Sequence, residues 1–413
     1  MPAVLLSANA NAIPIGSAIL YVNSFDGIDG PTCQDQANPC KTIGYALTKA
    51  VSGDTIKVAP GTYNGDLNIS QGVTLEGANY NISGNQKRLS ESMINGTVTI
   101  NSSDVTINGF TISPSSGKDT VTANFNTPYS NDIVSDNIIN APYAGQIGVH
   151  LNDNDSTVSN NIINYSNANA IGIETSNNSV DNFSVVSNNF VGLAENAPAD
   201  ITIIGSTPVA HDINISNNSS SSGATLAAIF NTNTATINDN TSINAAPNSA
   251  IYIGGNDSNV TVTDNTVHGA GKGIKIDNSY GDGPNSDVTA TNNDLSSNAI
   301  GAVVTNGAYT GGLPNFSDNW WGNANGPFDI VSTDGSIPAS NMDGKGSPAI
   351  GAMIYSPWCT DEYCLHDTNH LLAPTNIHML DNTHNNYAPL PPGPVPTTTN
   401  TTQLDLVWNP VPG

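Results

Sequence analysis

The sequence predicts an all-β chain that folds as a right-handed parallel β-helix, a solenoid of short stacked strands with an amphipathic helix covering its N-terminal end. Three observations predict this fold. A hexapeptide recurs along most of the chain, a second apolar motif recurs between its copies, and the repeats lack helical apolar periodicity. A repeat period of roughly 20 to 50 residues indicates stacked structural units, each of which becomes one coil of the solenoid.

The hexapeptide has the form apolar, polar, polar, Asn, any residue, often apolar, and its clearest copy is Val262–Val267. Further copies occur at Val134–Ile139, Val158–Ile163, Val186–Val191, Ile215–Ser220, Ile237–Ser242, Ala290–Leu295 and Phe316–Trp321. The aligned asparagines are Asn137, Asn161, Asn189, Asn218, Asn240, Asn265, Asn293 and Asn319. We interpret them as an inward ladder of stacked amides that satisfies buried polar groups at a corner of each coil. An outward row of ligand-binding amides is the alternative.

The second motif, small–apolar–any–apolar, follows each asparagine and alternates with period two, as short strands do. Its copies include Gly148–Leu151, Gly172–Thr175, Ala250–Ile253, Gly273–Ile276 and Gly301–Val304. The outward residues of these strands share one register, which predicts a stripe along one face. The candidate ligand-binding residues in this stripe are His150, Glu174, Tyr252 and Lys275. A sugar-binding groove and an ordinary solvated face are both compatible with them.

One segment has helical periodicity. Ile43, Leu47 and Val51 are spaced at i, i+4 and i+8 within Lys41–Val51, and Ser52 and Gly53 predict its end. A helix here would hide the open edge of the first coil, as capping units do in solenoids.

The chain divides into six predicted parts. They are an N-terminal extension (1–17), a strand and helix cap (18–63), the β-helix (64–358), an irregular C-terminal cap (359–387), a Pro/Thr linker (388–402) and a last segment (403–413). The last segment reads as a lone strand or the opening of a fibronectin-III-like module. Its apolar residues Leu404, Leu406 and Trp408 predict an assembly strand that pairs with a sheet edge of its own or a neighbouring molecule.

The N-terminal order Tyr-Val-Asn, Pro-Cys-Lys-Thr-Ile, an Ala-rich helix, then Gly-Asp-Thr-Ile-Lys-Val-Ala-Pro-Gly-Thr-Tyr (53–63) resembles the cap of secreted parallel β-helix repeat proteins. These belong to the pectate-lyase-like superfamily. Asn319–Gly322 with Gly326–Phe328 is similar to the last coil of surface-anchored members, whose aromatics would plug the open end of the core. The resemblance covers about residues 18–358 and implies the fold; it also brings polysaccharide lyases, hydrolases and epimerases into consideration.

Charge limits the partners. The formal net charge is −25, from 34 acidic and 9 basic residues, and Arg88 is the sole arginine. Phosphate binding needs clustered lysine and arginine, so nucleic acid and anionic membranes are poor partners, and we expect no nucleic-acid binding and no membrane insertion. The same deficit argues against a polyanionic sugar. No apolar stretch reaches the length of a membrane span.

The cysteines form two close pairs, Cys33 with Cys40 and Cys359 with Cys364, which predict two disulfides and an extracellular or cell-surface location. Metal ligation is the lesser alternative. Asn-X-Ser/Thr sequons, among them Asn68, Asn95, Asn154, Asn182, Asn256 and Asn315, make glycosylation a hypothesis. Met1–Ala12 resembles the tail of a signal peptide but lacks a basic start.

No complete catalytic set emerges from the sequence, and no cofactor or catalytic residue is assigned. Arg88 lies in an insertion without an acidic cluster, and Val267–Gly269 with Gly273–Ile276 matches a polygalacturonase pattern only in part. Acidic loops such as Asn152–Asp155, Asp277–Asp282 and Asp361–Glu362 could hold calcium through oxygen ligands, although surface solubility is the simpler explanation.

The sequence therefore favours a non-catalytic extracellular β-helix protein of the cell surface or an appendage. It would act in adhesion or structure, including filament formation, with itself or cell-surface glycans as partner. The alternative is a polysaccharide-binding or polysaccharide-cleaving module, which rests on fold analogy.

Overall fold

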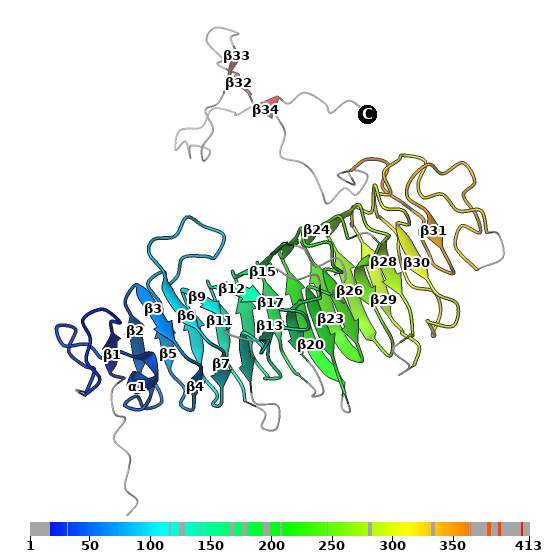
Figure 1. The fold of residues 1–413 in the computed structure, drawn as a ribbon. Coiled ribbons are helices and arrows are strands. Elements are labelled where there is room, and N and C mark those ends of the chain that lie inside the picture. Colours follow the sequence, from blue (N-terminus) through cyan, green and yellow to red (C-terminus); the bar gives the residue numbers. More distant parts are fainter. Residues whose placement is uncertain are drawn as a thin grey trace, which may run out of the picture.

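A computed structural model describes residues 17–364 except 31, 115–116, 124–128, 142, 166–168, 176–179, 193–198, 207–208, 246, 280–282, 332–334 and 363, together with the backbone of three short strands nearer the C-terminus. Three long parallel sheets form a single elongated body (Figure 1).

Sheet A contains β1 (Ile19–Val22), β2 (Thr55–Val58), β5 (Thr74–Glu76), β8 (Thr106–Asn108), β11 (Ile133–Ser135), β14 (Thr157–Ser159), β17 (Ser184–Val186), β20 (Ala210–Ser216), β23 (Thr232–Asn238), β26 (Ser258–Thr263) and β29 (Val288–Thr291). Sheet B contains β3 (Gly61–Asn64), β6 (Ser92–Asn95), β9 (Phe110–Ser113), β12 (Ile138–Ala141), β15 (Ile162–Tyr165), β18 (Asn189–Gly192), β21 (Ser219–Ser220), β24 (Thr241–Ile243) and β27 (Thr266–His268). Sheet C contains β4 (Leu67–Ile69), β7 (Val98–Ile100), β10 (Val121–Ala123), β13 (Ile147–His150), β16 (Ile171–Thr175), β19 (Ile201–Ile204), β22 (Ala227–Phe230), β25 (Ser249–Ile253), β28 (Lys272–Ile276), β30 (Ala302–Val304) and β31 (Ala349–Ile350).

The chain visits the sheets in turn, so every strand pairs in parallel with the equivalent strand of the next coil. Inward residues consequently form apolar columns. On sheet A one column holds Val158, Val185, Ile215, Ile237 and Val262, all fully buried. Parallel stacking with period-two burial confirms the predicted β-helix, and the core is a thin shaft enclosed by three sheets.

The N-terminal end is covered by β1 and a short helix, α1 (Ile43–Leu47). Thr42 caps the helix by accepting a hydrogen bond from the Tyr45 N–H, and α1 packs on β1, β2 and β4. The helix is shorter than predicted. It ends at Leu47, and Val51 is 49 % exposed, because the chain must already turn there to enter β2.

The C-terminal end is closed by aromatic side chains, as the resemblance implied, but only in part by the predicted residues. Trp321, which was predicted, and Tyr355, which was not, are fully buried, and the Trp358 ring lies 6.3 Å from the Tyr355 ring. Phe328, by contrast, is 38 % exposed. The disulfide between Cys359 and Cys364 forms beside this end. The Cys33–Cys40 disulfide forms in the N-terminal cap, so both predicted pairs are present.

From β11 to β27, each corner from sheet A to sheet B is a two-residue turn. Its first residue has a left-handed backbone, for example Asp136 (φ 57°), Asn160 (56°) and Asp264 (57°), and Asn and Asp tolerate that region best among non-glycine residues. Its second residue is a buried asparagine, which forms the ladder. Asn240 donates from its backbone N–H and Nδ2 to Oδ1 of Asn265, at 3.0 and 2.9 Å.

The ladder corrects one predicted residue. The amide that occupies its third position is Asn188, which accepts from Asn161 and donates to Asn218, whereas Asn189 begins β18 and is half-buried. Val186–Asn189 satisfies the sequence template, whereas Val185–Asn188 has the apolar Val186 at a polar position, so the pattern pointed to Asn189. The left-handed turn residue, Ser187 (φ 59°), sets the register. The other ladder members are Asn137, Asn161, Asn218, Asn240, Asn265, Asn293 and Asn319.

Near the C-terminus, β32 (His378–Leu380) pairs in antiparallel fashion with β33 (Tyr387–Pro389) and with β34 (Leu406–Val407). The predicted assembly strand thus pairs within its own chain at Leu406, while Leu404 and Trp408 lie outside the described residues. The N-terminal extension and most of the predicted linker also lie outside them. Among described helices, none is long and apolar enough to span a bilayer.

Candidate functional site

The predicted outward stripe is a row on sheet C. Strand register places His150 beside Glu174, then Thr202, Ala228, Tyr252 and Lys275 on successive strands. Neighbouring strands are about 4.8 Å apart, so Glu174 and Tyr252 are separated by roughly 14 Å along the axis. Thr202 and Ala228 are 5 % and 3 % exposed, and the accessible chemistry is therefore concentrated in two clusters at either side of them.

The first cluster, here called the acid–histidine cluster, consists of Asp119, His150 and Glu174. His150 Nδ1 lies 2.9 Å from Asp119 Oδ2, and His150 Nε2 lies 3.9 Å from Glu174 Oε1. The Ile147 N–H donates to Asp119 Oδ1 and fixes that carboxylate. The side chains are 24 %, 11 % and 15 % exposed in chain order. An imidazole held between two carboxylates can accept, hold and release a proton, as general acid–base chemistry requires.

Sequence reasoning missed Asp119. It lies in the connection before β10, one coil before His150, and belongs to no repeated motif. Only the parallel stacking of β10 on β13 brings the carboxylate to the imidazole. Proximity across coils of unequal length leaves no signal in the sequence.

The second cluster, here called the tyrosine–lysine cluster, consists of Tyr252, Lys275, Asp277 and Ser279. Lys275 Nζ lies 4.7 Å from the centre of the Tyr252 ring and forms an ion pair with Asp277. The Tyr252 hydroxyl bonds to Ser279 Oγ. Burial acts to raise the pKa of Asp277, but hydrogen bonds from Lys275 and the Asn278 N–H outweigh it and hold the pKa below its usual value. This part of the row therefore combines an aromatic ring, an amine and a carboxylate, from Tyr252, Lys275 and Asp277.

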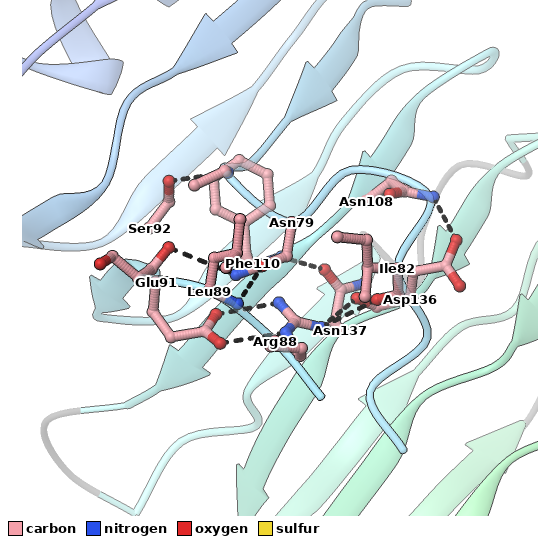
Figure 2. A network of polar contacts seen from close by, with 12 residues as sticks. Asn79, Ile82, Arg88, Leu89, Glu91, Ser92, Asn108, Phe110, Asp136 and Asn137 are labelled. Atoms are coloured by element: carbon pink, nitrogen blue, oxygen red, sulfur yellow. Dashed lines mark hydrogen bonds and ion pairs between the residues drawn. The ribbon is translucent and has the colours of Figure 1, made fainter. Parts of the chain in front are cut away.

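Arg88, the residue best suited to a basic catalytic role, belongs to a structural network on another side of the solenoid. Its guanidinium donates to both carboxylate oxygens of Glu91, at 3.0 and 2.9 Å, and to the carbonyls of Asp136 and Ile82 (Figure 2). The Arg88 side chain is 4 % exposed. Because every one of these contacts anchors a turn, Arg88 is unavailable to a substrate on sheet C.

This network belongs to residues 77–91, here called the strap, which crosses the corners between sheets A and B. Asn81 N–H donates to Asn108 Oδ1, and Gly84 N–H donates to the Asn160 carbonyl two coils further on. A Cβ at Gly84 would lie 2.5 Å from the Asn137 carbonyl oxygen, so the close approach requires glycine. The strap therefore braces several coils, a role the sequence did not reveal.

His268, in the segment with partial polygalacturonase similarity, lies on β27 of sheet B and not on the sheet C row. Its Nε2 contacts both Asp294 Oδ2 (2.8 Å) and Ser296 Oγ (3.2 Å). Since both partners share one nitrogen, His268 cannot take a proton from Ser296 while donating to Asp294. This arrangement does not form a nucleophilic triad.

In the described part of the chain, no group of three or more His, Cys, Asp or Glu side chains is arranged to hold a metal ion. In the loops considered for calcium, Asp155 accepts from Asn182 and Asp277 pairs with Lys275. Asp282 lies outside the described residues.

Two further aspartates are buried at structural corners. Asp257 accepts from three backbone N–H groups, those of Thr232, Gly254 and Gly255, and burial raises its pKa to about 7. Asp200 accepts from the hydroxyls of Ser220 and Ser222, and burial raises its pKa to about 6. Because the contacts of Asp257 and Asp200 join adjacent coils, we assign both residues a structural role.

No protein-family model matches the sequence, and no curated protein matches it. Solved structures with similar outlines are pectate lyase Pel9A (12 % identity, 87 % of this chain and 82 % of that one, TM-score 0.35) and a rhamnogalacturonan lyase (10 %, 71 % and 84 %, TM-score 0.37). Another is the A-module of the Azotobacter vinelandii mannuronan C-5 epimerase AlgE4 (15 %, 77 % and 92 %, TM-score 0.38). The chain has a parallel β-helix fold. Strand register and burial establish this fold, and at these TM-scores the neighbours add nothing to the site.

Proposed function

We propose that this protein is an extracellular β-helix protein that binds a neutral polysaccharide along the sheet C row. The observation that carries the proposal is the register that puts the acid–histidine and tyrosine–lysine clusters on one face of successive coils. A chain of several sugar units spans the roughly 14 Å between Glu174 and Tyr252.

The chemistry of the row suits uncharged sugars. Carboxylates accept hydrogen bonds from sugar hydroxyls, and the edge-packed pair Phe230 and Tyr252, with ring centres 5.4 Å apart, offers apolar surface for sugar C–H groups. Lys275, the cationic group of the row, is already beside the carboxylate of Asp277, and the His150 imidazole lies beside Asp119. A polyanionic sugar would meet no uncompensated positive charge there, and the net charge of −25 would repel it.

Glycan cleavage is a second candidate, favoured by the geometry at His150. The His150 imidazole lies between the carboxylates of Asp119 and Glu174, an arrangement in which a proton can be moved between side chains. General acid–base catalysis requires such a positioned group within reach of the glycosidic oxygen.

Adhesion through glycan contact fits the same face, whereas filament growth by end-to-end stacking finds less support. In the part of the chain that the structure describes, α1 covers one end of the core and Trp321 and Tyr355 close the other. Both disulfides support an oxidising, extracellular setting.

Binding is tested by calorimetric titration with neutral glucans, mannans and galactans, with polygalacturonate as the charged comparison. We expect Glu174→Gln and Tyr252→Ala each to weaken binding of the best neutral ligand about tenfold, equivalent to about 1.4 kcal/mol. Tyr80→Ala is the matched control, because Tyr80 is a 41 % exposed tyrosine on the strap. Unchanged affinity in both row variants, or preferential binding of polygalacturonate, would refute the proposal. Release of reducing ends from the polysaccharide by the wild type, but not by His150→Ala, would show that the protein also cleaves its ligand.

A further inference from the structure

Two carboxyl groups meet in the interior of the corner between sheets C and A, immediately after His150. Asp132 precedes β11 and Asp153 precedes β14, and the two side chains are 0 % and 1 % exposed. Buried carboxylates this close together cannot both keep a negative charge, because neither is solvated and their repulsion is unscreened.

The hydrogen bonds around the pair are incomplete unless a proton is present. Asp132 Oδ1 accepts from the Val105 N–H at 2.8 Å, and Asp153 accepts from the Tyr129 N–H. The Oδ2 atoms of both residues receive no hydrogen bond from any other described residue. The backbones of the two connections pair at a parallel bridge between Ser130 and Asn154, which brings the neighbouring carboxyl groups of Asp132 and Asp153 together. One proton between them supplies the missing donor.

We propose that Asp132 and Asp153 form a buried acid pair that shares one proton, and that loss of this proton at alkaline pH destabilises the corner following His150. Because both groups are buried and in contact, the stability of this corner, which joins successive coils, depends on pH.

The surroundings favour the protonated state. Asp104, on the preceding coil, adds negative charge, and burial, followed by the charge of Asp153, raises the pKa of Asp132 to about 8. Burial raises the pKa of Asp153 to about 6. Nearby, the Asp155 carboxylate accepts a hydrogen bond from Asn182, and the His150 imidazole lies beside Asp119 and Glu174.

The sign of the effect follows from proton linkage. An unfolded aspartate has a pKa of about 3.9, so the folded protein retains a proton that the unfolded chain has lost. Stability therefore falls as pH rises from about 4 toward the folded pKa of about 8, and no further above it. The stabilisation by the shared proton is fully present below about pH 4.

The experiment compares thermal unfolding of the wild type and Asp132→Asn between pH 5 and pH 9. An asparagine amide donates permanently, so we expect the wild type to lose roughly 5 °C more in Tm than the variant over this range. Asp155→Asn is the matched control and should keep the wild-type pH profile. Equal pH dependence in wild type and Asp132→Asn would overturn the proposal.

A second measurement needs no variant. Carboxyl ¹³C resonances of the wild type, labelled at aspartate, should include one pair that titrates in two separated steps, with one step at alkaline pH. Aspartates that all titrate below pH 5 would refute proton sharing. Stabilisation of the wild type, but not of Asp132→Asn, by added calcium at pH 8 would also refute it, because a cation would then occupy the pair.

Discussion

Replacing Asn188 by alanine tests the ladder and its register together. Asn188 Oδ1 accepts from the Asn161 backbone N–H at 3.1 Å and from Asn161 Nδ2 at 2.9 Å, while its own Nδ2 donates to the Val158 carbonyl at 2.8 Å. The Asn161 Nδ2 retains a second acceptor, the Val134 carbonyl. The substitution therefore strands one buried N–H and one buried C=O. At about 1–3 kcal/mol for each, we expect the free energy of unfolding to fall by about 2–6 kcal/mol.

The neighbouring Asn189→Ala is the matched control. Asn189 donates to Asn85 Oδ1 at 2.9 Å and accepts from Ser219 at 2.8 Å, in a half-buried position where water can replace both partners. Its loss should cost less than about 1 kcal/mol. Circular dichroism melts and guanidinium titrations of both variants give the comparison. If Asn189→Ala destabilised the protein as much as Asn188→Ala, the assigned register would be wrong.

Three other substitutions probe the strap and the C-terminal closure. Arg88→Met should lower the free energy of unfolding by about 2–4 kcal/mol, since it leaves Glu91 and two turn carbonyls unpaired. Unfolding in guanidinium chloride measures this loss, and the control Lys87→Met should change it little. Gly84→Ala places a Cβ against backbone atoms and should cost about 1–3 kcal/mol; a neutral effect on Tm would show that the strap yields at this point. Trp321→Ala should cost about 3–5 kcal/mol and make the last coils sensitive to proteolysis, and an unchanged digestion pattern would contradict the plug.

The fold could be predicted from the sequence because each coil repeats the same two local requirements. A turn residue that tolerates a left-handed backbone and a buried asparagine recur at the same corner, and both leave a mark on composition. The row on sheet C was predicted for a similar reason. His150, Glu174, Tyr252 and Lys275 occupy one position of a repeated motif, and stacking preserves that position.

What the sequence could not show depends on the lengths of the other corners. Asp119 reaches His150, and Asp132 reaches Asp153, across connections whose lengths differ from coil to coil. Arg88 reaches the Asp136 carbonyl through a strap that obeys no repeat. In the sequence, an acidic loop residue that is buried cannot be distinguished from one that is solvated. The buried acid pair of Asp132 and Asp153 therefore could not be predicted.

The constant two-residue corner between sheets A and B has a consequence for how such a chain changes over generations. Successive ladder asparagines are 22 to 30 residues apart, yet the turn that carries them keeps one length. Among the coils that carry the ladder, variation in coil length therefore falls in the strands and at the two remaining corners, which frame the sheet C face. The strap is an insertion at an earlier corner between sheets A and B. Duplication or deletion of a whole coil preserves every ladder bond except at the junction. New loops can thus be grafted beside the row, or the row lengthened, while the shaft that supports it stays the same.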